Sequence, residues 1–221
     1  MPLPNEAFGP DDFAACAHIS RETLAHLKLY AGMLTEWNSR QNLVSRASLN
    51  EMWLRHFWDS AQLAEFVPTA AKSLVDLGSG AGFPGLVLAE LLRDRAIRVV
   101  LYESTQKKRD FLEAVARRLN LAVAVRAERI EEATPEIFDL VVARALAPLD
   151  KLLAYAQRFW GPNTTGLFLK GQNMVPELTE AHKYWKMMLQ KYPSRTSDTG
   201  VVLEIRKLSN VAPGRTGTRR S

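Results

Sequence analysis

The chain has 221 residues, of which 47% are hydrophobic, enough to bury one substantial core. No apolar run approaches the roughly 20 residues that cross a bilayer, and the first residues lack the basic and apolar segments of a secretion signal. One cysteine and four scattered histidines exclude an internal disulfide and argue against a metal site. We therefore expect a globular, cytoplasmic protein with no bound metal and no membrane contact.

The net charge of +5 is concentrated at the C-terminal end. Residues 205–221 contain five basic side chains and no acidic one, whereas the rest of the chain has equal numbers of both. Residues 209–221 are expected to be a disordered basic tail. Such a tail most often aids solubility, and sequence-independent binding to RNA phosphates is the alternative.

The first part of the chain is predicted to be helical. Apolar residues recur at helical spacing over 20–38, and Ser20 is available as the N-cap of this helix. The capping-box pattern Ser48–Glu51 predicts a second helix, which carries aromatic and small apolar residues. We expect an N-terminal helical region over residues 10–68.

From residue 73 the pattern changes to short β-rich runs separated by helical segments. The predicted strands are 73–77, 97–103, 121–126, 138–143 and 165–170, with a closing hairpin near 188–206. This alternation predicts an α/β fold with a doubly wound, mostly parallel sheet and helices on both faces. Because no linker separates the two regions, residues 1–221 are expected to form a single domain with a helical cap.

The first predicted strand runs directly into a glycine-rich turn, and an apolar helix follows it. Gly78, Gly80 and Gly82 permit positive φ and allow a ligand to approach the backbone closely. The start of the following helix would present free backbone N–H groups to that ligand. The order of strand, loop and helix therefore predicts a nucleotide-cofactor site.

Several types of glycine loop compete for this segment. Gly80-x-Gly82-x-x-Gly85 matches the dinucleotide fingerprint. Asp76, however, would repel a pyrophosphate, whereas it suits a cofactor with an amino acid moiety. The pattern Asp76-x-Gly78-x-Gly80-x-Gly82 thus favours S-adenosylmethionine over NAD. No Lys-Ser or Lys-Thr pair follows the glycines, as a phosphate loop requires, and Ser79 lacks the glycines two residues away on either side that a hydrolase elbow has.

Two later strand ends supply further candidates for cofactor binding. Glu103 ends the second strand, where a carboxylate can accept hydrogen bonds from both ribose hydroxyls. An ordinary surface acid is the alternative. Ala127 and Glu128 follow the third strand, where a backbone N–H and a carboxylate can bracket an adenine edge. The assignment of Glu128 rests only on its position directly after the third strand, because Glu131 and Glu132 nearby are equally acidic.

Short motifs with a distinctive order extend over about residues 38 to 172. They are Asn42–Ser45, Arg55–Ser60, Asp76–Leu86, Glu103–Arg109, Arg126–Glu128, Phe138–Ala145 and Leu169–Gln172. In this order they resemble the small-subunit ribosomal RNA methyltransferase G family, also called glucose-inhibited division protein B. That family methylates guanine N7 in 16S ribosomal RNA.

The resemblance implies a seven-stranded, doubly wound S-adenosylmethionine-dependent methyltransferase fold, with 16S ribosomal RNA or the small ribosomal subunit as partner. It also implies that the cofactor site is lined by Gly78, Phe83, Ala127, Glu128 and Arg144. The chain departs from the family pattern at Glu103, where Asp is common, and at Leu146, where Phe is usual. The first change is chemically mild, and the second removes an aromatic side chain.

Guanine N7 carries a lone pair and no proton, so methyl transfer to it needs no general base. Catalysis then consists of placing N7 in line with the methyl carbon and sulfur. Arg144 follows the fourth strand, where cofactor and target pockets meet in this fold. It is the candidate catalytic residue, because its guanidinium can donate to a cofactor carboxylate or to guanine O6. A buried ion pair with Asp139 or Asp150 is the alternative.

Basic residues at three places are candidates for contact with RNA. Two lie with Asp59 within one turn of the second helix, two open a helix whose dipole opposes them, and one ends the fifth strand. For each, a capping interaction or a solvated position is the alternative. The candidates are Arg55, His56, Lys107, Lys108 and Lys170.

The expected function is methylation of guanine N7 in 16S ribosomal RNA by a monomeric enzyme. The glycine loop alone fits two other functions equally well. One is a small-molecule methyltransferase with the same cofactor site, and the other is a non-catalytic nucleotide-binding or RNA-binding protein. Whether methyl transfer requires RNA distinguishes the first alternative. Detectable turnover on any acceptor excludes the second.

Overall fold

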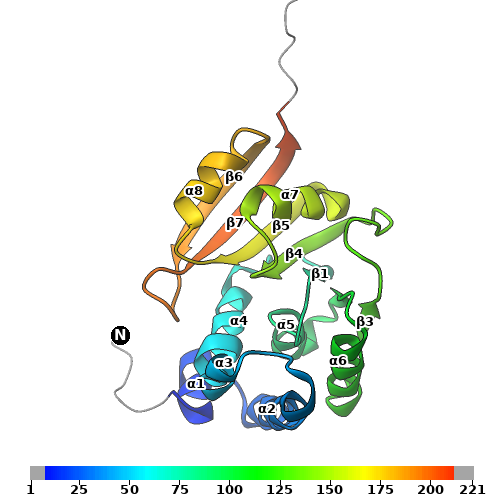
Figure 1. Ribbon diagram of the computed structural model, residues 1–221, viewed down its shortest axis with the longest axis vertical. Coiled ribbons are helices and arrows are strands. Elements are labelled where there is room, and N and C mark those ends of the chain that lie inside the picture. The colour runs from blue at the N-terminus through cyan, green and yellow to red at the C-terminus, as the bar shows by residue number, and fades with distance from the viewer. Residues whose placement is uncertain (1–7, 212–221) are drawn as a thin grey trace, which may run out of the picture.

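A computed structural model describes residues 8–211, and these contain one seven-stranded sheet (Figure 1). The strands are β1 (Ser73–Leu77), β2 (Arg98–Tyr102), β3 (Val123–Arg126), β4 (Phe138–Arg144), β5 (Trp160–Lys170), β6 (Trp185–Pro193) and β7 (Val201–Asn210). Their order is β3-β2-β1-β4-β5-β7-β6, and only the pairs that β7 forms with β5 and β6 are antiparallel. The predicted doubly wound, mostly parallel sheet is confirmed. Its order reverses between β1 and β4, where such sheets bind ligands.

The sheet extends beyond the predicted strands at its C-terminal end. β5 begins at Trp160 rather than at residue 165, and the closing hairpin runs from Trp185 to Asn210. The first two residues of the expected disordered tail therefore belong to β7. The backbone N–H of Val211 still donates to the Tyr184 carbonyl at 2.8 Å. The remainder of the expected tail, residues 212–221, lies outside the described residues.

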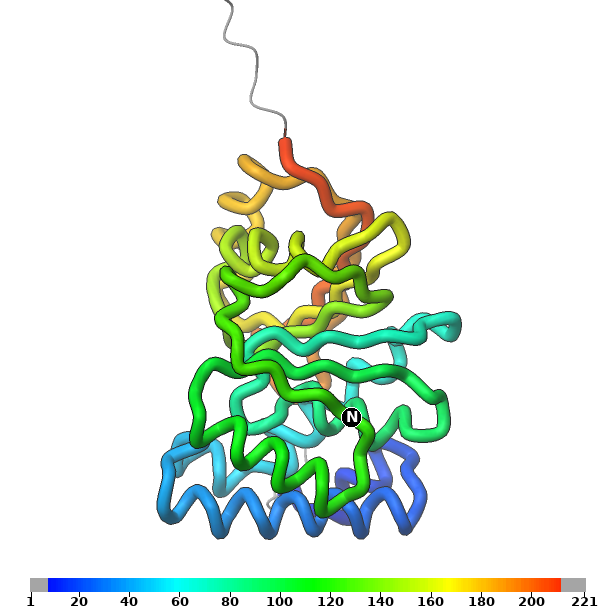
Figure 2. The backbone as a smooth tube through the Cα atoms, turned by 90° about the vertical axis from the view of Figure 1, so that its right-hand side faces the viewer, coloured from blue at the N-terminus to red at the C-terminus, as the bar shows by residue number. Residues whose placement is uncertain are grey.

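The helical cap is built from six short and long segments. They are α1 (Pro10–Ala17), α2 (Arg21–Gln41), α3 (Arg46–Asn50), the π-helix η1 (Trp53–Trp58), α4 (Asp59–Ala61) and the 3-10 helix η2 (Gln62–Phe66). Ser20 caps α2 as predicted, because its hydroxyl accepts the Thr23 N–H at 3.0 Å. Figure 2 shows α2 running across one end of the molecule.

The prediction that Ser48 begins the second helix is wrong. Ser45 is the N-cap of α3, and its hydroxyl accepts the Ser48 N–H at 3.1 Å. The Ser48 hydroxyl instead donates back to the Ser45 carbonyl at 2.9 Å. The chain leaves α2 at the left-handed Asn42, and the Ser45 hydroxyl, three residues on, already caps the next helix before Ser48 is reached.

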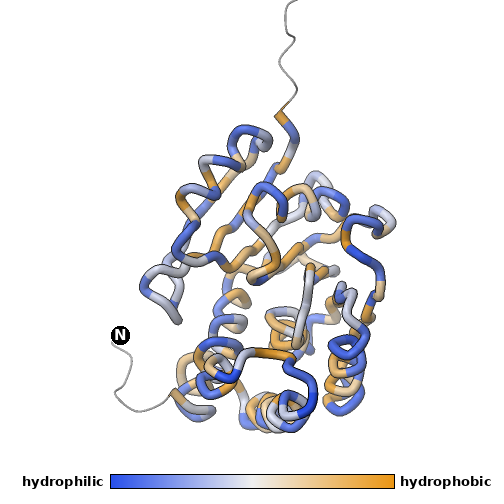
Figure 3. Tube along the Cα trace, viewed as in Figure 1, coloured by the Kyte–Doolittle hydropathy of each residue, from blue (hydrophilic) through white to orange (hydrophobic). Residues whose placement is uncertain are grey.

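The remaining helices cover the two faces of the sheet. They are α5 (Gly85–Leu91), η3 (Arg93–Arg95), α6 (Gln106–Arg118), α7 (Leu149–Ala156), η4 (Gln157–Phe159) and α8 (Met174–Ala181). Alternate strand residues pack on opposite faces: Leu74 and Leu140 face the cap, α5 and α6, whereas Val75 and Val141 face α7 and α8. The strands are accordingly apolar for much of their length (Figure 3). None of the helices within residues 8–211 is long and apolar enough to span a bilayer.

Aromatic side chains join the cap to the glycine-rich loop. Tyr30 stacks on Phe83 with ring centroids 5.2 Å apart and planes inclined by 11°, and Phe57 meets the same ring edge-on at 5.3 Å. The buried Tyr30 hydroxyl also donates to the Ala81 carbonyl. The cap therefore fixes the position of the loop in addition to covering the sheet.

Candidate active site

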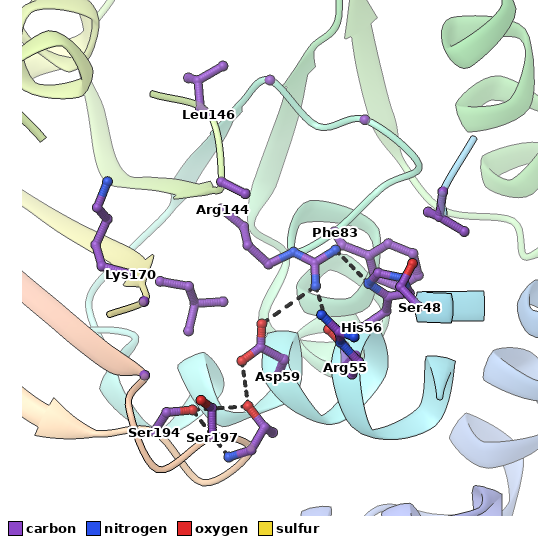
Figure 4. Close-up of a pocket in the computed structure, with 18 of the residues that line it drawn as sticks. Ser48, Arg55, His56, Asp59, Phe83, Arg144, Leu146, Lys170, Ser194 and Ser197 are labelled. Carbon is purple, nitrogen blue, oxygen red and sulfur yellow. Dashed lines mark hydrogen bonds and ion pairs between the residues drawn. The ribbon is translucent and has the colours of Figure 1, made fainter. Parts of the chain in front are cut away.

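A cavity of about 1140 Å³ lies at the carboxyl ends of the parallel strands. Its wall includes the glycine loop, the segment after β4, the end of β5, the cap and the loop between β6 and β7. This is the side of the sheet and the switch point at which doubly wound folds bind ligands. Figure 4 shows the polar side chains that meet in it.

The glycine loop has the backbone conformation that its sequence predicts. Gly78, Gly80 and Gly82 adopt φ values of 71°, 59° and 96°, a region that other residues rarely enter. Gly78 also lies under Leu146, because a Cβ atom there would be 2.5 Å from the leucine Cδ1. Gly78 and Gly80 thus offer partly exposed backbone to the cavity, as an S-adenosylmethionine site requires, whereas Gly82 is buried.

Asp76 is completely buried beneath this loop rather than in the cavity wall. Its Oδ2 accepts the Gly85 N–H at 3.0 Å, and its Oδ1 has no partner within residues 8–211. Burial raises the pKa of this carboxyl to about 7. An unpaired buried acceptor is costly. Because this carboxyl is closed off from the cavity, it supports the glycine loop through Gly85 rather than facing a ligand there.

Glu103 fastens the glycine loop to the end of β2. Its Oε2 accepts the Gly80 N–H at 3.0 Å, and its Oε1 accepts the Thr105 N–H at 2.8 Å. Each carboxylate oxygen keeps a second lone pair, which can accept a ribose hydroxyl as predicted. Ala127 and Glu128 are exposed just after β3 and lie outside the cavity wall, although β3 adjoins Glu103 through the bond from the Glu103 N–H to the Arg126 carbonyl.

Arg144 connects β4 to the cap. It donates from Nη1 to the Arg55 carbonyl at 2.6 Å and from Nη2 to His56 Nδ1 at 2.9 Å, and Nη1 lies 3.5 Å from Asp59 Oδ2 (Figure 4). The guanidinium carbon is 5.2 Å from the centroid of the Phe83 ring. The side chain therefore stands where the glycine loop and the cap meet.

The ion pairs considered for Arg144 from the sequence do not form. Asp139 instead accepts the N–H groups of Lys72 and Ser73 at 2.8 and 3.0 Å at the start of β1, and Asp150 lies in the first turn of α7. The actual carboxylate partner, Asp59, comes from the cap. Burial raises the pKa of Asp59, against the opposing effects of Arg144 and Thr196.

His56 is buried and stacks on Phe83 with ring centroids 4.9 Å apart. Burial, together with the nearby charges of Arg144 and Arg55, lowers its pKa to about 3. The ring is therefore neutral at physiological pH. Because Arg144 only donates, Nδ1 is the acceptor and the proton resides on Nε2, which has no partner in the described part of the chain. A neutral, buried ring is poorly suited to the phosphate contact predicted for it.

The basic candidates for RNA contact are separated by the fold. Arg55 is exposed beside the cavity and pairs loosely with Glu51 at 3.4 Å, Lys108 is half-buried in the cavity wall, and Lys107 is exposed outside it. Lys170 is used within the protein: its Nζ lies 2.5 Å from Glu177 and donates to the Ala147 carbonyl at 2.9 Å.

The loop between β6 and β7 is the part of the cavity wall that sequence reasoning missed. Ser194, Thr196 and Ser197 line the cavity, and Thr196 contacts Asp59. A run of serines and threonines reads as an ordinary turn, and only the pairing of β7 with β5 brings it to the site. Within residues 8–211 no three His, Cys, Asp or Glu side chains come together as metal ligands.

Comparison with solved structures shows the same fold. The chain is similar to the ribosomal protein L11 methylase of Lactobacillus delbrueckii subsp. bulgaricus, with a TM-score of 0.54 and 17% identity over 66% of this chain and 75% of that one. It is also similar to a TehB-like SAM-dependent methyltransferase of Corynebacterium glutamicum, with a TM-score of 0.54 and 16% identity over 80% and 98%. The expected Rossmann-like methyltransferase fold is therefore confirmed.

Sequence comparison identifies the family. The model of the rRNA small subunit methyltransferase G family matches residues 23–200. Proteins named ribosomal RNA small subunit methyltransferase G are 46% identical in Rhodospirillum centenum, over 96% of this chain and 95% of the relative, and 46% identical in Parvibaculum lavamentivorans, over 90% and 89%. The chain belongs to the rRNA small subunit methyltransferase G family, which confirms the family, the enzyme class and the S-adenosylmethionine cofactor expected from its motifs.

Proposed function

We propose that this protein methylates guanine N7 in 16S ribosomal RNA, with Arg144 as the residue that orients the target base. The observation that supports this role most directly is the position of Arg144. Its guanidinium stands in the cavity between the glycine loop and the cap, within reach of both. A target base that enters the cavity would therefore meet the arginine beside the cofactor.

Different residues of the chain are proposed to contact different parts of the cofactor. The glycine loop cradles its central part, Glu103 accepts from the ribose, and Ala127 with Glu128 holds the adenine. Asp76 would act from beneath the loop, where its Oδ2 accepts the Gly85 N–H and holds the start of α5 in place. When bound, S-adenosylmethionine supplies a methyl group activated by a sulfonium.

The chemistry at guanine needs orientation rather than proton removal. Since N7 carries no proton, neither His56 nor Asp59 has to act as a base, and both already contact Arg144. Arg144 has five N–H donors, so it can contact guanine O6 and leave N7 free. Such alignment is worth several kcal/mol in a bimolecular transfer.

The RNA contacts follow the cations that remain accessible near the cavity. Arg55, Lys107 and Lys108 are proposed to bind phosphates of the small-subunit RNA, which would make binding sensitive to salt. Lys170 joins them only by giving up its pair with Glu177. We further propose that the enzyme acts as a monomer in the cytoplasm, where its RNA substrate is assembled.

A reconstituted methyl-transfer assay tests this function. Labelled S-adenosylmethionine is supplied with small subunits, with protein-free 16S RNA or without RNA, and the labelled nucleoside is identified. We expect RNA-dependent formation of 7-methylguanosine, and at least a tenfold slower reaction with Arg144→Lys. Transfer to a ribose or an exocyclic nitrogen, or turnover without RNA, would contradict the proposal.

A further inference from the structure

The loop between β6 and β7, residues 194–200, attaches to the helical cap. Arg195 pairs with Glu65 at 2.5 Å, and just before the loop Tyr192 packs on Phe66 with ring centroids 4.4 Å apart. These contacts bring the C-terminal hairpin to Asp59. That carboxylate lies between the loop and Arg144 (Figure 4).

Two donors fix the orientation of the Asp59 carboxylate by binding the same oxygen. The Thr196 hydroxyl donates to Oδ1 at 2.7 Å, and the Gln62 amide donates to the same oxygen at 3.0 Å. The other oxygen, Oδ2, is left facing Arg144 Nη1 at 3.5 Å. Because the terminal torsion of an aspartate is otherwise broad, these two donors decide which way the carboxylate faces.

The loop also orients both of these donors. Gln62 is buried, and its amide oxygen accepts the Arg195 N–H at 3.0 Å, which turns its NH₂ group toward Asp59. The Thr196 hydroxyl lies 3.0 Å from that of Ser194, and the same Ser194 oxygen accepts the Thr196 N–H at 3.2 Å. The loop thus supports Asp59 once directly and once through Gln62.

We propose that Thr196 is a positioning residue for methyl transfer, which acts through Asp59 to hold the Arg144 guanidinium in its productive direction. The inference rests on the role proposed above for Arg144. Without the Thr196 hydroxyl, Oδ1 keeps only the Gln62 donor, so the Asp59 carboxylate is held less firmly toward Arg144. Arg144 keeps its bonds to the Arg55 carbonyl and to His56, so the site stays formed while the direction set by Asp59 is weakened.

Single-turnover methylation of small subunits at saturating RNA and cofactor tests this role. We expect Thr196→Val to lower the rate about tenfold, with an unchanged S-adenosylmethionine Kd and melting temperature. Thr196→Ser keeps the hydroxyl and is expected to keep the rate. Thr199→Val is the matched control on the same loop, because within residues 8–211 the Thr199 hydroxyl forms a hydrogen bond only with Ser197 and none with Asp59. A Thr196→Val rate within twofold of the unaltered protein would overturn the proposal.

A double-mutant cycle separates this inference from the role of Arg144 itself. If Thr196 acts through Arg144, combining Thr196→Val with Arg144→Lys slows the reaction less than the product of the separate effects. Fully multiplicative effects would overturn the positioning role, even with a slow Arg144→Lys enzyme. A fully active Arg144→Lys enzyme would refute the role of Arg144 instead. Thr196→Ala provides the same comparisons if valine lowers the melting temperature.

Discussion

Replacing Glu103 with alanine is expected to weaken S-adenosylmethionine binding while the protein stays folded. The carboxylate accepts two backbone N–H groups, from Gly80 at 3.0 Å and from Thr105 at 2.8 Å. It therefore fixes the middle of the glycine loop in addition to its proposed ribose contact. Loss of one charged hydrogen-bond partner costs about 1 to 3 kcal/mol, which corresponds to about a 5- to 150-fold increase in the cofactor Kd.

Calorimetric titration of the cofactor into each variant measures this effect. Glu113→Ala is the control, because that residue lies on α6 and pairs only with Arg117 within residues 8–211, at 3.7 Å across an exposed helix surface. Its Kd should match that of the unaltered protein. A Glu103→Ala Kd within twofold of that value, with an unchanged melting temperature, would refute the assignment of Glu103 to the cofactor site.

Three further expectations concern the loop, the histidine and the tail. Gly80→Val should abolish S-adenosylmethionine binding in calorimetry while the fold survives, because Gly80 needs a φ of 59°; a heat of binding for NAD in place of S-adenosylmethionine would oppose the assignment. His56→Gln should keep much of the single-turnover rate, and that rate should show no histidine titration between about pH 6 and 9, since the pKa of His56 is about 3; a loss of several orders of magnitude would reveal a chemical role. Because unfolding restores the ordinary pKa of about 6.5, the unaltered protein should lose stability as pH falls from about 6.5 toward 3, and His56→Gln should reduce this loss in denaturant titrations. Removal of residues 212–221 should weaken RNA binding and flatten its salt dependence without changing the cofactor Kd; identical salt slopes would mark the tail as a solubility feature.

The truncation is placed after Val211 because the structure shows that the folded part extends to this residue. Cutting at Leu208, the boundary that charge distribution suggests, would remove Ser209 and Asn210 from β7. It would also remove the bond between Val211 and Tyr184. An effect on RNA binding would then be confounded by damage to the sheet.

Local signals were sufficient to predict most of the strands, the glycine loop and the cap of α2. Each depends on residues near one another in the chain, such as Ser20 and Thr23. The capping-box rule failed at Ser48, because Ser45 caps the helix three residues earlier without a Glu or Gln at the third position. When two serines lie close together in the sequence, only the backbone conformation shows which of them is the N-cap.

The surroundings of Arg144 could not be predicted, since they depend on contacts between distant segments. Asp59 and Thr196 are 137 residues apart in the sequence, and no sequence motif includes both of them. Burial also depends on contacts between distant segments. In the sequence Lys170 and His56 look like accessible polar side chains. In the folded protein Lys170 forms an ion pair with Glu177, and His56 is a buried, neutral ring.

The most direct test of the central claim is to map 7-methylguanosine in 16S ribosomal RNA from cells with and without this protein. Mass spectrometry of RNA fragments locates the modified nucleotide, and the purified enzyme with S-adenosylmethionine is then added to small subunits from the deficient cells. We predict that one guanine loses its N7 methyl group in those cells and regains it on addition of the enzyme. An identical pattern of N7 methylation in both cell types would contradict the account.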